Sequence, residues 1–228
     1  MTMITKTLIT FRFCHETKQG RIRRAETKNV SILHMLGDYR HLIPSLLRNK
    51  GLLKAVCVSV LLYITNMVSS NFFSLYVTQR LGLAEDLLAM FPILNAIVML
   101  VFMLGIQHRL DAAKFRVPLW IGLTLYSIAA LVLIFSPSGH LGFVLLYVFL
   151  GAVASALVGP RKEALLQLNL DPQERARLNA LIMASTVAFT SPFGYLTGWL
   201  SSIDRRLPFV FACLLFIAAM LVIRTIQE

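Results

Sequence analysis

Polar side chains recur along one face of the first long apolar run in the sequence. The series is Ser59, Tyr63, Asn66, Ser70 and Ser74. Spacings of three and four residues place all five on a single stripe if this run is helical. Their hydroxyl and amide groups exchange hydrogen bonds and carry no charge near neutral pH. This polar stripe therefore indicates either a pathway for a neutral substrate or hydrogen bonds that hold neighbouring helices together, and we favour the pathway.

Other polar and aromatic residues lie at similar depth in the apolar runs. Asn71 flanks the polar stripe, and Asn95 stands eight residues into the second run. Phe189 and Thr190 lie near the centre of the fifth run. Polar groups near the midplane are typical of substrate sites in transporters. The predicted substrate-pathway residues are Tyr63, Asn66, Ser70, Asn71, Ser74, Asn95, Phe189 and Thr190.

Proline and glycine residues in the apolar runs predict a hinge and helix-packing faces. Pro192 interrupts the fifth run and, with Gly194 and Gly198, predicts a hinge, although proline also occurs in membrane helices without a role. Small residues four apart let helices approach closely, and we interpret two such sets as packing faces. These sets are Gly151, Ser155 and Gly159, and Gly194 and Gly198.

Residues that could carry catalysis or proton transfer are missing from the apolar runs. All eleven acids and all five histidines fall between these runs or at the ends of the sequence. An intramembrane serine protease needs a base at the depth of its nucleophile, and a proton relay needs a buried group that changes charge. The three cysteines have no metal-binding spacing. We therefore predict no enzyme, no metal and no cofactor.

The composition indicates a membrane protein. Of the 228 residues, 57% are hydrophobic and 14% are charged, whereas an average soluble domain is about 25% charged. Six runs approach or exceed the roughly 20 residues that a spanning helix needs. They cover 52–77, 87–107, 117–135, 141–160, 178–201 and 207–223. The predicted fold is an all-α integral membrane bundle of six transmembrane helices, with the lipid bilayer as its surroundings.

The distribution of basic residues predicts the orientation. Residues 1–54 hold eleven of the 22 Lys and Arg and only three acids. If the six runs span a membrane, 19 of the 22 fall on one side, which predicts that this side and both termini are cytoplasmic in a multi-pass cell-membrane protein. A nucleic-acid-binding tail is the less favoured interpretation of the basic block, so no nucleic-acid partner is predicted.

The organisation predicted is a basic arm, residues 1–51, followed by the bundle, residues 52–228. Helices one to three cover 84 residues, and helices four to six cover 83. Equal triplets that enter the membrane from opposite sides are typical of a 3+3 inverted repeat. Pro160 is expected to end the fourth helix, and 161–170 to form a separate helix along the membrane face. Asp171 is a predicted N-cap for the fifth helix.

Three segments resemble a known family. They are Phe11-Arg12-Phe13 followed by Glu16-Thr17-Lys18, Gly105 to Asp111 continued by Lys114 and Arg116, and Pro192-Phe193-Gly194 with Gly198. The chain thereby resembles the C-terminal six-helix half of a major facilitator superfamily transporter together with its central cytoplasmic loop. The second segment is similar to the family's Gly-x-x-x-Asp-Arg-x-Gly-Arg-Arg loop, although six residues separate Gly105 from Asp111 and no glycine follows Asp111.

The resemblance implies a function and a missing partner. It implies alternating-access transport, with a gating loop formed by Gly105, Arg109, Asp111 and Arg116. Few charged groups lie in the runs, so we expect efflux of a neutral or lipophilic drug-like small molecule. The complementary bundle would be a second six-helix half or a homodimer partner. Met1 to Thr5 resemble a vector-borne β-galactosidase start, which fits a truncated fusion product. The alternative is a non-transporting membrane fragment or scaffold; an intramembrane enzyme is less favoured.

Overall fold

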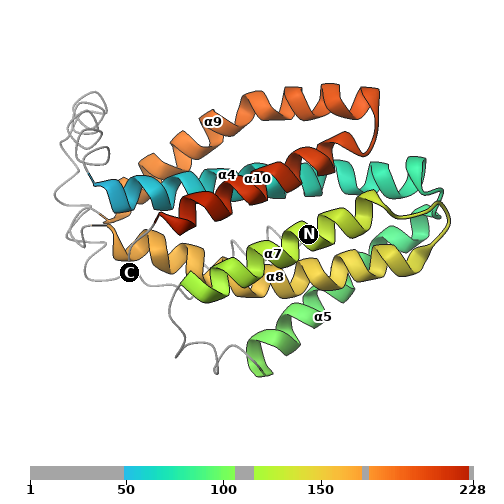
Figure 1. Cartoon of the computed structure of the whole chain (residues 1–228), viewed down its shortest axis with the longest axis horizontal. Coiled ribbons are helices and arrows are strands. Elements are labelled where there is room, and N and C mark those ends of the chain that lie inside the picture. The colour runs from blue at the N-terminus through green and yellow to red at the C-terminus, as the bar shows by residue number, and fades with distance from the viewer. Residues whose placement is uncertain (1–48, 106–115, 171–174, 226–228) are drawn as a thin grey trace, which may run out of the picture. The chain divides into compact units, whose positions relative to one another are not determined.

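The computed structural model describes residues 49–105, 116–170 and 175–225, and the side chains of 176 and 177 are not among them. These residues belong to one compact unit, Leu46–Glu228. Every regular element among them is helical (Figure 1). In chain order the elements are α4 (Lys50–Leu75) with a π-helical turn (Tyr76–Arg80), a 3₁₀ turn (Glu85–Ala89) with α5 (Met90–Gly105), α7 (Arg116–Ile134), α8 (Leu141–Leu168), α9 (Arg175–Ile203) and α10 (Leu207–Arg224).

Six helices in the described part are long and apolar enough to cross a membrane. The prediction of six membrane-length helices is confirmed. The segments that qualify are Lys50–Arg80, Glu85–Gly105, Arg116–Ile134, Leu141–Leu168, Leu178–Ile203 and Leu207–Arg224. Several predictions fall on residues that the structure does not describe. These are most of the basic arm, including the β-galactosidase-like start, the gating residues Arg109 and Asp111, and the predicted cap Asp171.

The fourth helix differs from its prediction at the C-terminal end. α8 continues through Pro160 to Leu168, so the expected helix end and the separate surface helix 161–170 are both wrong. Proline removes one backbone hydrogen bond, but packing on both sides of it can hold a helix together. Leu157 and Leu165, on either side of Pro160, are buried. The guanidinium of Arg161 also donates to the carbonyl oxygen of Leu157 at 3.5 Å.

The core lies between α4, α7, α8 and α10. One buried cluster joins Val68 of α4, Leu123 of α7 and Phe216 of α10. A second cluster lies around Tyr76, whose hydroxyl donates to the carbonyl oxygen of Leu133 at 2.9 Å and whose ring packs edge-on against Phe209. α5 and α9 lie at the two edges of the bundle: α5 packs mainly on α8, and α9 packs on α4 and α10 (Figure 1).

Gly122 allows a close helix contact, at a position different from those predicted. A Cβ atom at Gly122 of α7 would overlap the side chain of Val158 in α8 and lie 3.2 Å from the Leu157 Cβ. A Cβ atom would meet nothing within 4 Å at any of the glycines in the predicted packing faces, namely Gly151, Gly159, Gly194 and Gly198. The packing interpretation of those faces is therefore wrong for the described bundle.

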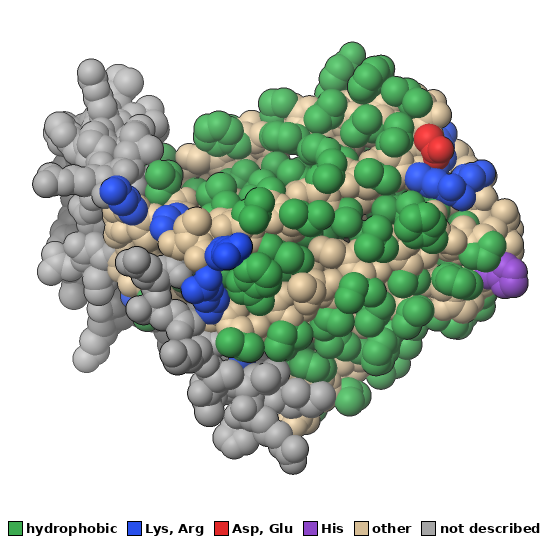
Figure 2. Space-filling model, viewed as in Figure 1, with side chains coloured by type: hydrophobic (Ala, Val, Ile, Leu, Met, Phe, Trp, Pro, Cys, Tyr) green, Lys and Arg blue, Asp and Glu red, His purple; other side chains and the backbone are tan. Residues whose placement is uncertain are grey.

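The ends of four helices are joined at what we call the basic end, the end marked by Lys54, Arg116 and Arg224. Lys54 donates to the carbonyl oxygen of Thr225, and Arg116 donates to that of Arg224 at 2.8 Å. Cations beside the carbonyls at a helix C-terminus stabilise it. Asn49, which caps α4, also donates to the carbonyl oxygen of Asn169 at the end of α8. Figure 2 shows Lys and Arg toward both ends of one face and apolar side chains between them.

Candidate functional site: a cavity between α4, α5 and α8

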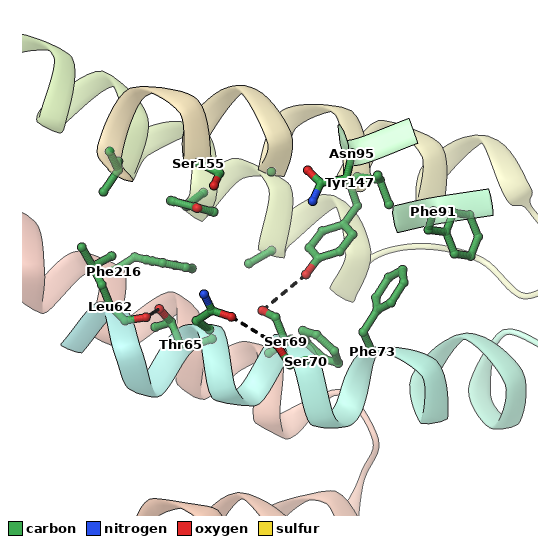
Figure 3. Close-up of a pocket in the computed structure, with 18 of the residues that line it drawn as sticks. Leu62, Thr65, Ser69, Ser70, Phe73, Phe91, Asn95, Tyr147, Ser155 and Phe216 are labelled. Atoms are coloured by element: carbon green, nitrogen blue, oxygen red, sulfur yellow. Dashed lines mark hydrogen bonds between the residues drawn. The ribbon is translucent and has the colours of Figure 1, made fainter. Parts of the chain in front are cut away.

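The described bundle contains a cavity of about 570 Å³, open on one side, between α4, α5 and α8 (Figure 3). Side chains of α7 and α10 complete its lining. Its volume falls in the range of pockets that hold drug-sized molecules. Its polar or aromatic lining residues are Tyr63, Thr65, Asn66, Ser69, Ser70, Phe73, Ser74, Phe91, Asn95, Tyr126, Tyr147, Ser155, Lys162, Phe209 and Phe216.

α4 supplies the longest polar side of the cavity. Four members of the polar stripe, from Tyr63 to Ser74, line it, because a helix brings residues three and four apart to the same face. The hydroxyl of Ser70 donates to Oδ1 of Asn66 at 3.1 Å, which orients the amide. Ser59, one turn earlier, is buried and does not line the cavity.

α8 forms the opposite side through small residues. Tyr147, Gly151, Ser155 and Gly159 are four residues apart and all line the cavity. The glycines and the serine leave room there, because no large side chain projects from these positions. The hydroxyl of Tyr147 donates to Oγ of Ser69 at 3.5 Å and so joins α8 to α4 across the cavity (Figure 3).

Aromatic rings lie in two places around the cavity. Phe73 stacks on Tyr147 with ring centroids 5.3 Å apart and meets Phe91 edge-on at 5.5 Å. Tyr126 of α7 and Phe216 of α10 stack in parallel at 4.9 Å. These rings offer flat apolar surfaces on which an aromatic or lipophilic ligand can pack.

Among the lining residues that the structure describes, Lys162 carries the one charged side chain. Its Nζ lies 3.0 Å from Oε1 of the adjacent Glu163, whose side chain is the more exposed of the two. Lys162 reaches the cavity because α8 continues beyond Pro160. It stands three residues after Gly159, on the same side of the helix.

The structure brings together five of the eight predicted substrate-pathway residues: Tyr63, Asn66, Ser70, Ser74 and Asn95. The amide of Asn95 comes from α5 (Figure 3).

The other three predicted pathway residues do not line this cavity. Asn71 is exposed one position away from the polar stripe, a rotation of about 100° around the helix. Phe189, on α9, is 69% exposed. Thr190 is buried, and its hydroxyl donates to the carbonyl oxygen of Val187.

None of the described residues of the predicted hinge and gate lines the cavity. Pro192, Gly194 and Gly198 lie within α9, which runs unbroken from Arg175 to Ile203. Gly105 is the exposed last residue of α5, and Arg116 begins α7 at the basic end. The hinge and the gate therefore stay predictions.

Four lining residues that matter most to the chemistry were not predicted as site residues: Tyr126, Tyr147, Ser155 and Lys162. The spacing of four from Tyr147 to Gly159 was the available signal, because it marks one face of a helix. Among the described residues no group of three His, Cys, Asp or Glu could hold a metal ion. The lining as described offers hydrogen bonds, aromatic stacking and one positive charge.

No family model, curated protein or solved structure matches this chain. The fold and the cavity therefore define its class on their own: an all-helical protein with six helices of membrane length and a polar and aromatic cavity between them.

Proposed function

We propose that the protein takes part in transport of a lipophilic small molecule across a membrane by alternating access, in the manner of half of a major-facilitator-type exporter. The observation that carries the proposal is the open cavity lined by Asn66 and Asn95 between helices of membrane length. Lipid tails cannot satisfy amide groups. A cavity of this kind therefore faces water, a ligand or another protein rather than lipid.

The packing of the helices supports a 3+3 arrangement. If the first three helices are exchanged with the last three, α4 corresponds to α8, α5 to α9, and α7 to α10. Under this exchange the α4–α10 contact corresponds to the α8–α7 contact. The α5–α8 contact likewise corresponds to the α9–α4 contact. Each of these pairs is in contact, whereas the contact of α9 with α10 has no comparable counterpart between α5 and α7. An inverted repeat would produce this correspondence.

The exposure of α5 and α9 supports a second bundle. The share of buried residues in the spanning part is 6% for the α5 segment and 22% for α9, against 33% to 44% for the other four. These two helices correspond under the proposed repeat, so one partner could cover both. A second six-helix half or a second copy of the chain would supply the other side of the cavity.

The orientation we propose places the basic end in the cytoplasm of a cell membrane. Around the described helix ends, Lys50, Lys54, Arg116 and Arg224 stand at the basic end. The opposite end has equal numbers of both signs: Arg80, Arg205 and Arg206 against Glu85, Asp86 and Asp204. An excess of Lys and Arg on the cytoplasmic side is the usual rule.

The second candidate is a non-transporting fragment or scaffold. The low burial of α5 favours this candidate, because it indicates that a partner bundle is needed to cover α5. Without that partner, the chain could bind a substrate but would have no second bundle to move against.

The test uses the purified full chain, first in detergent and then in lipid vesicles. Binding and uptake of a panel of radiolabelled lipophilic aromatic solutes are measured for the wild type and for the double variant Asn66→Ala/Asn95→Ala. Loss of two hydrogen bonds of about 1 kcal/mol each predicts binding weaker by at least tenfold. Asn71→Ala is the matched control, since it removes an exposed amide outside the cavity.

The outcomes separate the two candidates. Saturable binding with uptake supports transport, whereas saturable binding without uptake supports the fragment. Equal binding by the double variant and the Asn71 control would refute the cavity as the site. Mass measurement of the detergent complex reports whether a second copy is present.

A further inference from the structure

The continuation of α8 past Pro160 gives the cavity a positively charged end. A helix that stopped at Pro160 would leave Lys162 on a separate surface segment. In the described bundle Lys162 instead follows Ser155 and Gly159 on the side of α8 that lines the cavity. It lies two turns, or about 10 Å, beyond Ser155 along the helix axis.

The charge of Lys162 has no opposing charge within the lining. No Asp or Glu is among the lining residues in the described part of the chain. The carboxylate that pairs with Lys162 belongs to Glu163, which is 57% exposed, whereas Lys162 is 28% exposed. An exposed ion pair contributes little stability. A ligand carboxylate entering the cavity can therefore replace Glu163 as the partner of Lys162 at small cost.

The aromatic surface lies deeper than the charge. Tyr126 is ten residues from Arg116 at the start of α7, and Phe216 is eight residues from Arg224 at the end of α10. The stacked pair is therefore roughly 12 to 15 Å from the basic end along the helix axes. A ligand that contacts both the rings and Lys162 needs an apolar body and an anionic group about one nanometre apart, by the same helix geometry.

We propose that the cavity binds a lipophilic monoanion, with its aromatic or apolar body against Tyr126 and Phe216 and its acidic group on Lys162. The proposal rests on the proposed function and narrows its substrate class from neutral or lipophilic molecules to lipophilic acids. The shared chemistry is an anionic oxygen on an apolar body. Its source is either a free organic acid or an anionic phospholipid.

The test compares two probes that differ only in charge. Equilibrium binding of radiolabelled 6-(2-naphthyl)hexanoate and of its primary amide is measured on the full chain in a non-ionic detergent. We expect the wild type to prefer the carboxylate by about tenfold, the contribution of one charge-assisted hydrogen bond. Lys162→Gln is expected to remove the preference, so that the carboxylate and the amide bind with similar affinity. Lys162→Arg retains the preference.

Two control variants separate a specific contact from general surface charge. Lys50→Gln removes an exposed cation at the start of α4, outside the cavity, and is expected to leave the preference unchanged. Glu163→Gln removes the competing carboxylate and is expected to strengthen carboxylate binding by about two- to threefold, the scale of one exposed ion pair. An unchanged preference in Lys162→Gln overturns the inference.

The failure of this inference can be told apart from failure of the proposed function. If the amide binds and Asn66→Ala/Asn95→Ala weakens it while Lys162→Gln does not alter selectivity, only the inference fails. If neither probe shows saturable binding, the cavity fails as a ligand site altogether.

A competition experiment with lipids then identifies the source of the anion. Phosphatidylglycerol and phosphatidylcholine are titrated against the bound carboxylate probe. Displacement by phosphatidylglycerol alone, lost in Lys162→Gln, assigns the site to an anionic lipid. Displacement by neither assigns it to a free organic acid.

Discussion

Gly122→Ala should destabilise the bundle although it adds a single methyl group. The new Cβ would overlap the side chain of Val158, and it would lie 3.2 Å from the Leu157 Cβ and 3.3 Å from the carbonyl oxygen of Ala154. Val158 is buried and β-branched, so its rotamer cannot change freely. Two of the three neighbours are fixed to the α8 backbone, so the helices themselves must separate.

The magnitude is the difference between two effects. Overpacking of a tight interior costs about 1 to 3 kcal/mol. Replacing glycine by alanine within a helix returns about 0.5 to 1 kcal/mol. We therefore expect Gly122→Ala to lower the free energy of unfolding by about 1 to 2 kcal/mol.

The assay is reversible unfolding in mixed detergent and SDS micelles, followed by circular dichroism. Gly198→Ala is the matched control: it lies within α9, where a Cβ would meet nothing within 4 Å, and is expected to be neutral or slightly stabilising. Val158→Ala in the Gly122→Ala background should recover at least half of the loss, since it removes the overlapped methyl. If Gly122→Ala were as stable as Gly198→Ala, the close approach of α7 and α8 would be refuted.

Three further variants test other parts of the bundle. Asn49→Ala removes the side-chain cap that accepts from the Leu52 amide and the bond to α8, and should cost about 1 kcal/mol in the same unfolding assay. Gly139→Ala forces a side chain onto a φ of +79° and should cost about 1 to 2 kcal/mol, whereas alanine at the helical Gly142 should not. Pro160→Ala restores a backbone donor and should raise the unfolding free energy while it preserves carboxylate preference, because Lys162 stays on the same face.

The number and position of the helices could be predicted from the sequence because their signal is local. Each span is a continuous apolar run, and the bilayer sets the required length. The prediction that the fourth helix ends at Pro160 is wrong because the deciding contacts are not local in the sequence. Proline favours a helix end by local chemistry, but buried neighbours such as Leu157 and Leu165 keep α8 continuous, and their packing cannot be read from the run itself.

The α4 side of the cavity could also be predicted from a local pattern in the sequence. Tyr63, Asn66, Ser70 and Ser74 stand out because polar groups in an apolar helix are rare and share one face. The α8 side escaped prediction, since glycine and serine four apart indicate close packing and open space equally well. At Gly151 the space is open, because no other helix lies close to it. The distance to another helix cannot be predicted from the spacing of residues along one helix.

The sparse packing of α5 has a consequence for assembly. Its principal neighbour is α8, which begins 36 residues after α5 ends and is therefore synthesised later. If the six helices span a bilayer, α5 enters it with few protein contacts until α8 is synthesised. A bilayer could solvate it in that interval, because its segment is the most apolar of the six and has the smallest buried share in the described bundle. In such a membrane, assembly of this bundle would depend on a helix that is inserted early and meets its main neighbour late.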